Sequence, residues 1–303
     1  MSILVVERFI LDSYSSFSVP DLIFHVDTLT TRAFRGNPIS VCVLEKPRER
    51  PWMREVSREL NTSETAFLLP RSPNRFDLRT MSGSMEVEMS ALATLAAAHV
   101  LFTSTPVAER PLADPRRPIS FFTRGGPVPA SLERENNVEN AEIHLNFPGF
   151  FLEELSEIPE AILQGVDPAP EFAGRRGEDY FVQVSSEEQL REIRPDFKFL
   201  REMGMGSLVV TSVANRTTSH DFVYRTFHIP APSEDPIASY AHCLLGPFWF
   251  LRLGKTALAG FHRSPKASPA LQRNPIALRL AIDGDRVKLM GHAVTIFEGE
   301  LKL

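Results

Sequence analysis

Residues Met89–Phe102 read M-S-A-L-A-T-L-A-A-A-H-V-L-F, a run in which nearly every side chain is apolar. Alanine and leucine favour the α-helix, and the run is long enough for about four turns. A helix without a polar face must be surrounded by protein or by lipid, and this one is too short to span a bilayer. The pattern therefore predicts a helix buried in protein, with the strand-like segments on both sides wrapped around it.

A second apolar run, Ile237–Leu251, reads I-A-S-Y-A-H-C-L-L-G-P-F-W-F-L in the other half of the chain. It follows Glu234-Asp235-Pro236, which predicts a helix start because an acidic residue precedes a proline at the first helical position. Two buried helices, each embedded in strands, predict two related lobes. If the N-termini of the two helices face each other, they would form a site for an anionic or electron-rich group.

The composition is that of an ordinary globular chain, with 303 residues, 43% of them hydrophobic and 23% charged. The net charge of −5 and the lack of a Lys/Arg stripe argue against a nucleic-acid partner. The apolar start at Met1–Val6 is too short for a signal peptide, and no run has transmembrane length. Two cysteines, Cys42 and Cys243, fit a reducing compartment. We therefore expect a cytoplasmic protein with no membrane partner.

Alternating and β-branched segments predict a strand-rich chain with few other helices. In the first half we expect a helix at Pro51–Leu60 and strands at Leu22–Asp27, Ile39–Leu44, Thr65–Leu69, Phe76–Met81, Ile119–Arg124, Val128–Glu133 and Glu142–Phe147. In the second half we expect a helix at Glu187–Met203 and strands at Asp179–Ser185, Ser207–Val213, Phe222–Ile229, Thr256–His262, Ala277–Ile282 and Val287–Glu298. The pattern favours an α+β fold with an extension (1–21), an N-terminal lobe (22–148) and a C-terminal lobe (149–303). Periodicity alone leaves a doubly wound sheet open.

The sequence has none of the spacings that mark a metal or nucleotide site. Its eight histidines form no His-x-x-x-His pair, the cysteines form no Cys-x-x-Cys pair, and no Gly-x-Gly-x-x-Gly, Walker or Gly-x-Ser-x-Gly motif occurs. We therefore expect no metal and no nucleotide cofactor.

Glu64 is the most informative charged residue, in the stretch Asn61-Thr-Ser-Glu64-Thr-Ala-Phe-Leu-Leu69. Its carboxylate lies between small hydroxylated residues and is followed at once by an apolar strand. In a pocket with apolar walls its pKa would rise, which would make it a general acid or base near neutral pH. The alternative is an ordinary glutamate at a helix end or in a loop, and spacing alone favours that alternative.

Several stretches together resemble the PhzF-like family of phenazine-biosynthesis isomerases and their relatives. They are Arg35-Gly-Asn-Pro-Ile-Ser-Val-Cys-Val-Leu44, Ser63-Glu-Thr-Ala-Phe-Leu68, Glu86-Val-Glu88 with Ala93-Thr-Leu-Ala-Ala-Ala-His-Val-Leu-Phe102, Asp221-Phe-Val-Tyr-Arg-Thr-Phe227, Glu234-Asp-Pro236 with Ala241-His-Cys-Leu-Leu-Gly-Pro-Phe-Trp249, and Val287-Lys-Leu-Met-Gly-His-Ala-Val294. They occur in order from about Phe24 to Leu301, so the resemblance covers nearly the whole chain.

The resemblance implies the diaminopimelate epimerase fold, in which two pseudo-symmetric lobes each wrap a mostly antiparallel sheet around a central helix. The C-terminal strand would cross over to the first lobe, and the active site would lie in the cleft between the lobes. It also implies that no organic cofactor is needed and that a homodimer is possible. The family's glutamate, in its Ser-Glu-Thr motif, shuttles a proton, and that role maps onto Glu64.

The chain departs from the family at both helix starts. The family usually has Cys-Gly-His or Asp-Gly-His where this chain has Met89-Ser90-Ala91. It usually has Asp-Pro-x-Thr-Gly-Ser-Ala where this chain has Asp235-Pro-Ile-Ala-Ser-Tyr-Ala241. The Ser-x-Arg-Gly-Gly region is also replaced, by Ser264-Pro-Lys-Ala-Ser268.

These departures predict a larger and more apolar substrate than a small amino-acid-like carboxylate. Glycine at a helix start lets a carboxylate approach the backbone N–H groups, and Ser90 and Ser239 add side chains there. An alternative makes Ser90 a plain helix cap. The predicted substrate-binding residues are Ser90, Ala91, Met89, Ser239, Ala238, His25 and Asp27, the last two because they adjoin a strand that lines the cleft in relatives. His99 and His242, inside the buried helices, are more often core residues than catalysts.

We therefore predict an isomerase or cyclase acting on a small, fairly apolar metabolite of specialised biosynthesis. Glu64 would be the general acid and base, Asp235 would orient it or a substrate hydroxyl, and Tyr240 would donate a hydrogen bond to a developing oxyanion or enol. Proton shift, ring closure and pericyclic rearrangement all fit a dry, preorganised cleft. The alternative is a catalytically inactive family member that serves as a binding or partner protein.

Overall fold

The computed structural model describes residues 21–83, 85–104, 113–114, 116–133, 141–230, 233–234, 240–263 and 277–302, which we call the described residues. The predicted extension (1–21) therefore lies almost wholly outside them. No helix within these ranges is long and apolar enough to cross a membrane.

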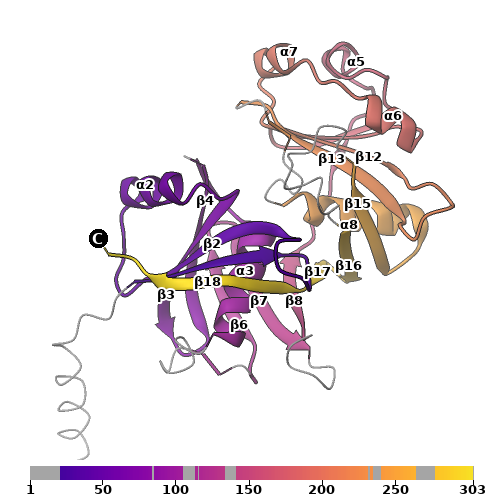
Figure 1. Ribbon diagram of the computed structural model, residues 1–303. Helices are drawn as coiled ribbons and strands as arrows, with labels where there is room; N and C mark the ends of the chain where they lie inside the picture. Colours follow the sequence, from indigo (N-terminus) through magenta and orange to yellow (C-terminus); the bar gives the residue numbers. More distant parts are fainter. Residues whose placement is uncertain are drawn as a thin grey trace, which may run out of the picture.

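Strands dominate both halves of the chain (Figure 1). The first half contains β1 Leu22–Thr28, β2 Asn37–Val43, β3 Glu64–Ser72, β4 Arg75–Ser82, β5 Met85–Val87, β6 Ile119–Thr123, β7 Gly126–Glu133 and β8 Glu142–Pro148. The second half contains β9 Glu153–Glu154, β10 Phe172–Arg176, β11 Asp179–Gln183, β12 Ser207–Val213, β13 Phe222–His228, β14 Ser233–Glu234, β15 Ala257–His262, β16 Ala277–Asp283, β17 Arg286–Gly291 and β18 Ala293–Glu300. The helices are α2 Arg50–Leu60, α3 Ala91–Thr103, α5 Glu160–Gly165, α6 Glu187–Glu192, α7 Phe197–Glu202 and α8 Ala241–Leu253.

The strands form one continuous sheet. Its pairings run β18–β1–β2–β3–β4–β6–β7–β8–β17–β16–β15–β13–β12–β11–β10–β9, with β5 beside β4 and β14 beside β13. The parallel pairs are β2–β3, β4–β6, β11–β12 and β13–β15. All other pairs among the described strands are antiparallel. This confirms the predicted α+β class and excludes a doubly wound sheet, whose strands would run mostly parallel.

The sheet folds around α3 with one half and around α8 with the other (Figure 1). Helix α3 contacts β1, β2, β3, β8 and β18, whereas α8 contacts β15, β16 and β17. The antiparallel pair β8–β17 joins the two halves. The last strand, β18, pairs with β1, so the end of the chain returns to the first half (yellow in Figure 1). The lobe boundaries at 22–148 and 149–303 stay predictions.

Helix α3 is buried on every side, as its sequence predicts. All its residues except His99 and Thr103 are buried. Helix α8 is buried from Ala241 to Trp249 and ends at Gly254, which adopts the left-handed conformation with φ 66°. The predicted start of this helix at Ile237 lies outside the described residues.

Two predicted elements are wrong. The long helix Glu187–Met203 is two short helices, α6 and α7, because Pro195 lacks an N–H and disfavours helical conformation in the residue before it. The single strand Val287–Glu298 is two strands, because β17 pairs with β8 and β16 whereas β18 pairs with β1. The sequence also gave no signal strong enough to predict the short strands β5, β9, β10 and β14 or the helix α5.

Gly260 lies on β15 opposite Phe222 of β13, whose ring covers it. A Cβ atom at Gly260 would lie 2.3 Å from Phe222 Cζ, and that buried ring stacks on Trp249 with centroids 5.7 Å apart. Gly260→Ala should therefore destabilise the protein by about 1–3 kcal/mol, because a rigid ring must move. Urea unfolding measures this loss.

The matched control is Gly299→Ala on β18, where the nearest atom to an added Cβ is 3.8 Å away. We expect it to change the free energy of unfolding by less than about 0.5 kcal/mol. Equal losses in the two variants would show that the Phe222 contact does not limit position 260.

Candidate active site

Glu64 is the first residue of β3 and is buried, with 5% of its surface exposed. Ala66 and Leu68 follow it at alternate positions and pack in the core around α3. Because successive side chains of a strand point to opposite faces, Glu64 points to the same side as these two residues. The sheet therefore directs the carboxylate toward the central helix and not toward solvent.

Ser90 is the N-cap of α3 and contacts Glu64 directly. Its backbone is extended, and its Oγ accepts a hydrogen bond from the Ala93 N–H at 3.1 Å. The same hydroxyl donates its proton to Glu64 Oε2 at 2.5 Å. Ser90 is thus a helix cap, as one alternative has it, and also the partner that fixes the orientation of the Glu64 carboxylate.

The residues flanking Glu64 form a scaffold that explains two of the sequence motifs. Ser63 Oγ donates to Pro38 O at 2.8 Å and accepts from Asn37 Nδ2 at 2.9 Å. Thr62 Oγ1 lies 2.9 Å from the Glu64 carbonyl oxygen. Gly36, just before β2, leaves no room for a side chain, because a Cβ there would lie 2.5 Å from Thr28 O. The start of β2 at Asn37 and Pro38 and the start of β3 at Glu64 therefore hold each other in place.

Met89 and Ala91 flank Ser90 as buried apolar residues. Met89 packs against the β6–β7 turn, where a Cβ at Gly125 would lie 3.0 Å from Met89 Cε. Ala91 is fully buried in the core around α3. The surroundings of the Glu64–Ser90 pair are thus dry on the helix side. Contact of Met89 or Ala91 with a substrate stays a prediction.

The structure does not bring His25 and Asp27 to Glu64. They alternate along β1 with Phe24 and Val26, which pack in the core around α3, so their side chains lie on the opposite face of the sheet. The His25 ring stacks on Phe297, and its burial lowers its pKa, partly offset by the charge of Asp27.

Asp27 supports a loop. Its Oδ2 accepts a hydrogen bond of 2.7 Å from the Phe34 N–H, and Phe34 has a left-handed backbone with φ 64°. Both residues lie on the predicted strand, on the face opposite the one that packs on α3, and their contact with a substrate stays a prediction.

Tyr240 precedes the first turn of α8 at its N-cap position, and Cys243 N–H donates to its carbonyl at 2.8 Å. Its ring packs edge-on against Phe150 with centroids 5.8 Å apart. The Arg176 guanidinium lies 3.9 Å from the Phe150 ring centroid and 5.7 Å from that of Tyr240. An aromatic and cationic group therefore surrounds the start of α8. The other predicted residues of this region, Asp235, Ala238 and Ser239, lie outside the described residues.

The titratable residues within the central helices are poorly suited to proton transfer. Burial lowers the pKa of His99 to about 4 and that of His242 to about 3. His99 Nε2 lies 3.1 Å from Thr295 Oγ1, and His242 Nε2 lies 3.3 Å from Cys243 Sγ. Burial also raises the pKa of the Cys42 and Cys243 thiols, which keeps them protonated.

Sequence reasoning missed an ion pair in the second half. Arg225 of β13 is 4% exposed and pairs with Glu234, the residue before Asp235. The available signal was an arginine in the middle of the strand Phe222–His228, whose other residues are mostly apolar.

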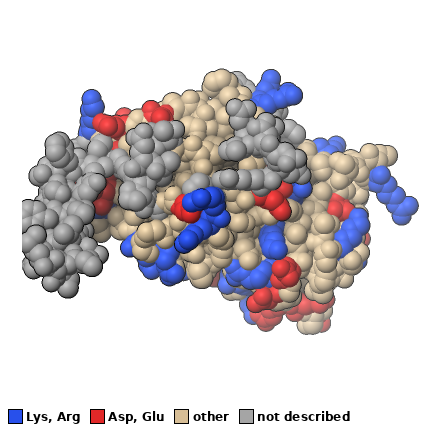
Figure 2. All heavy atoms as spheres, turned by 90° about the horizontal axis from the view of Figure 1, so that it is seen from below, with Lys and Arg blue, Asp and Glu red and all other residues tan. Residues whose placement is uncertain are grey.

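Charge and metal-binding groups add no further site. On the face seen in Figure 2, Lys and Arg side chains lie among Asp and Glu side chains, and the described residues there form no continuous basic stripe. Nor do the described residues contain a group of three or more His, Cys, Asp or Glu placed to hold a metal ion.

A continuous sheet folded around two buried helices, with a carboxylate at the start of one of them, defines the diaminopimelate epimerase-like class. Within that class, the family model described as phenazine biosynthesis-like protein, PhzC-PhzF, matches residues 26–299, and the chain belongs to this family. The resemblance of the sequence motifs is thereby confirmed.

Relatives match over nearly their whole length. An uncharacterized isomerase of Halalkalibacterium halodurans is 35% identical over 93% of this chain and 98% of its own. An uncharacterized isomerase of Pseudomonas aeruginosa is 33% identical over 92% and 98%. The crystal structure of a PhzF family protein from Enterococcus faecalis superposes with a TM-score of 0.74 at 28% identity, covering 94% of this chain and 100% of that one. The names of the two sequence relatives assign them an isomerase activity.

Proposed function

We propose that this protein is a cofactor-independent isomerase or cyclase that acts on a small, fairly apolar metabolite of specialised biosynthesis, with Glu64 as the general acid and base. The observation that carries the proposal is the buried Glu64 carboxylate, which accepts a 2.5 Å hydrogen bond from the N-cap of α3. Membership of the family and the isomerase names of relatives support the same reaction class.

The proposed chemistry needs one group that takes and returns a proton. Glu64 would remove a proton from a carbon of the substrate, the electron pair of that C–H bond would shift along the substrate, and Glu64 would return the proton at another carbon. Ser90 would keep the carboxylate aimed during both steps, since its hydroxyl is fixed by the Ala93 N–H. The N-terminus of α3 would favour negative charge at this point.

The second half of the protein would complete the site. We propose that Asp235 orients Glu64 or a substrate hydroxyl, that Tyr240 donates to a developing oxyanion or enol, and that Ala238 and Ser239 contact the substrate. Met89 and Ala91, both buried and apolar, support a substrate that is held by shape. His25 and Asp27 are not included, because they lie on the opposite face of β1.

A catalytically inactive binding or partner protein is the second candidate. Its support is Ser90 and Ala91 at the start of α3, where the family usually has glycine and histidine. Against it stands the geometry of Glu64, which an inactive protein would have no reason to keep buried and aimed. A cytoplasmic location and a homodimer stay predictions.

The experiment is a deletion of the gene in the organism that carries it, followed by a mass-resolved comparison of metabolites. We expect an isomer of the normal product to accumulate and the gene on a plasmid to remove it. Purified protein should then convert the accumulated compound without added cofactor. An unchanged metabolite profile would favour the binding protein over the enzyme.

A further inference from the structure

Arg225 is a buried cation in an apolar layer. Val223 and Phe227, two residues before and after it on β13, point to the same face of the sheet as Arg225. Both belong to the hydrophobic cluster beneath α5, α6 and α7. Only 4% of its surface is exposed. A buried charge is costly unless it is paired and hydrogen-bonded, so the partners of this guanidinium show what it holds together.

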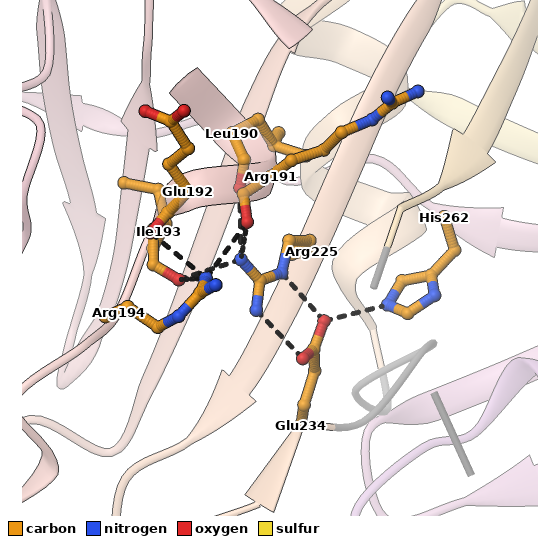
Figure 3. A network of polar contacts seen from close by, with 8 residues as sticks. All are labelled: Leu190, Arg191, Glu192, Ile193, Arg194, Arg225, Glu234 and His262. Atoms are coloured by element: carbon orange, nitrogen blue, oxygen red, sulfur yellow. Dashed lines mark hydrogen bonds and ion pairs between the residues drawn. The ribbon is translucent and has the colours of Figure 1, made fainter. Parts of the chain in front are cut away.

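The guanidinium joins the end of α6 to Glu234 (Figure 3). Its Nε and Nη2 donate to the two carboxylate oxygens of Glu234 at 2.9 and 3.0 Å. Its Nη1 donates to the carbonyl oxygens of Leu190 at 3.0 Å and Ile193 at 2.9 Å. The last carbonyls of a helix lack partners within the helix, so Arg225 caps α6 while it also forms the ion pair with Glu234.

The ion pair with Arg225 is the main contact that positions Glu234. Its strand, β14, has only two residues, which pair with Phe227 and His228 of β13. Such a short ladder fixes the backbone weakly, whereas a two-pronged Arg–carboxylate pair fixes both distance and plane. On the other side, His262 Nε2 lies 3.6 Å from Glu234 Oε1. Burial lowers the pKa of His262 to about 4, so at neutral pH it packs against the carboxylate uncharged.

Stability alone does not account for a pair of this kind. A buried ion pair is often no more stabilising than apolar residues of the same volume, because both charges lose their hydration. The pair does, however, hold Glu234, the last residue of β14, in one position. The next residue in the chain is Asp235, and α8 with Tyr240 at its N-cap follows a few residues later.

We propose that Arg225 and Glu234 are a positioning pair for the reaction: they fix the chain at Glu234 and thereby restrict where Tyr240 and the start of α8 can lie. Because Arg225 also binds the carbonyls at the end of α6, the pair would link α6 to the second half of the active site. This proposal rests on the proposed function for the reaction, but its structural part can be tested without a substrate.

The first test is hydrogen exchange of the amides near the start of α8. Glu234→Gln keeps the shape of the side chain but removes its charge, and Arg225→Lys keeps the charge but removes the fork. In both variants the amides from Cys243 to Leu245, the first of which donates to Tyr240 O, should exchange at least about tenfold faster. The amides of α3 should exchange at the wild-type rate.

The second test is turnover of the compound that accumulates in the deletion strain. Both variants should lower kcat by about 10–100-fold and change KM by less than about twofold, since misplacing a reacting group by an ångström has an effect of this size. Glu153→Gln is the matched control. Glu153 forms the same two-pronged pair with Arg175 in the same half of the chain, but it is exposed, and its loss should leave kcat unchanged.

The exchange and turnover measurements together distinguish a positioning role from a general stabilising role. Faster exchange confined to α8 together with a lower kcat supports positioning. Equal acceleration in α3 and α8 would show a general stabilising role, and unchanged exchange in α8 would overturn the proposal. If wild-type protein fails to convert the accumulated compound, the proposed function fails, and the exchange measurement still decides whether Arg225 and Glu234 fix the start of α8.

Discussion

Glu64→Gln should lower kcat for the compound that accumulates in the deletion strain by about 1,000-fold or more, a loss typical of removing a general acid–base group. The amide has nearly the same shape as the carboxylate and can still accept the hydrogen bond from Ser90, but it cannot take a proton from carbon. The fold should therefore be kept, and KM should stay within a few-fold of wild type. Steady-state kinetics and thermal unfolding of the same preparation measure both effects.

Removing the Ser90 hydroxyl should lower kcat less than removing the Glu64 carboxylate, which this hydroxyl orients. Ser90→Ala removes both the cap of α3 and the hydrogen bond to Glu64, so we expect about a 10–100-fold lower kcat and about 1 kcal/mol lower stability. The double variant with Glu64→Gln should lose no more activity than Glu64→Gln alone, because the two side chains act as one unit.

Glu55→Gln is the control for this charge change. Glu55 lies on α2 with 60% of its side chain exposed and pairs only with arginines of the same helix among the described residues. Its loss should leave kcat unchanged. If Glu64→Gln keeps more than a tenth of the wild-type kcat, Glu64 is not the proton carrier, and catalysis would have to rest on shape or on Tyr240 and Asp235.

The parts of the fold that the sequence predicts correctly are those with a strong local signal. Helix α3 has no polar face, and this alone shows that it is buried. Strand β12 is predicted at its observed bounds because most of its residues are apolar or β-branched and a glycine precedes it. Local signals fail where pairing with a distant strand decides where a strand ends. At the end of β17 the chain leaves β8 and continues as β18, which pairs with β1.

The candidate site shows the same limit. Sequence could single out Glu64 because a carboxylate at the start of an apolar strand is unusual, but it could not pair it with Ser90, because that contact depends on how the sheet folds around α3. Sequence could also not show which face of β1 carries His25. A position on a cleft-lining strand has an even chance of facing away, and only the burial of its neighbours Phe24 and Val26 shows which face is which.

Acidification between pH 6 and 5 should destabilise the protein by up to about 4 kcal/mol per pH unit. His99, His242 and His262 all have their pKa lowered by burial, to about 4, 3 and 4, against an ordinary value of 6.5. Below 6.5 the unfolded chain binds a proton at each of them whereas the folded protein does not, so stability is full above 6.5 and is lost as the pH falls toward 4. Each such proton contributes about 1.4 kcal/mol per pH unit.

Two further histidines add to this slope, because burial also lowers the pKa of His25 and of His220. The guanidinium of Arg79 lowers the pKa of Glu86, which adds to the loss at still lower pH, whereas burial raises the pKa of Asp179, which opposes it. Since domains have about 5–15 kcal/mol of stability in all, we expect unfolding near pH 4.5–5. Urea unfolding at pH 7.5, 6.0 and 5.0, followed by tryptophan fluorescence, measures the slope.

His99→Gln tests whether the histidines cause the slope. Glutamine can keep a hydrogen bond to Thr295 Oγ1 but does not titrate, so the slope between pH 6 and 5 should fall by about 1.4 kcal/mol per unit. At pH 7.5, where His99 is neutral in both the folded and the unfolded chain, the change should be limited to packing. The same slope in wild type and variant would mean that His99 takes up its proton in the folded protein, which its half-buried position against Thr295 of β18 opposes.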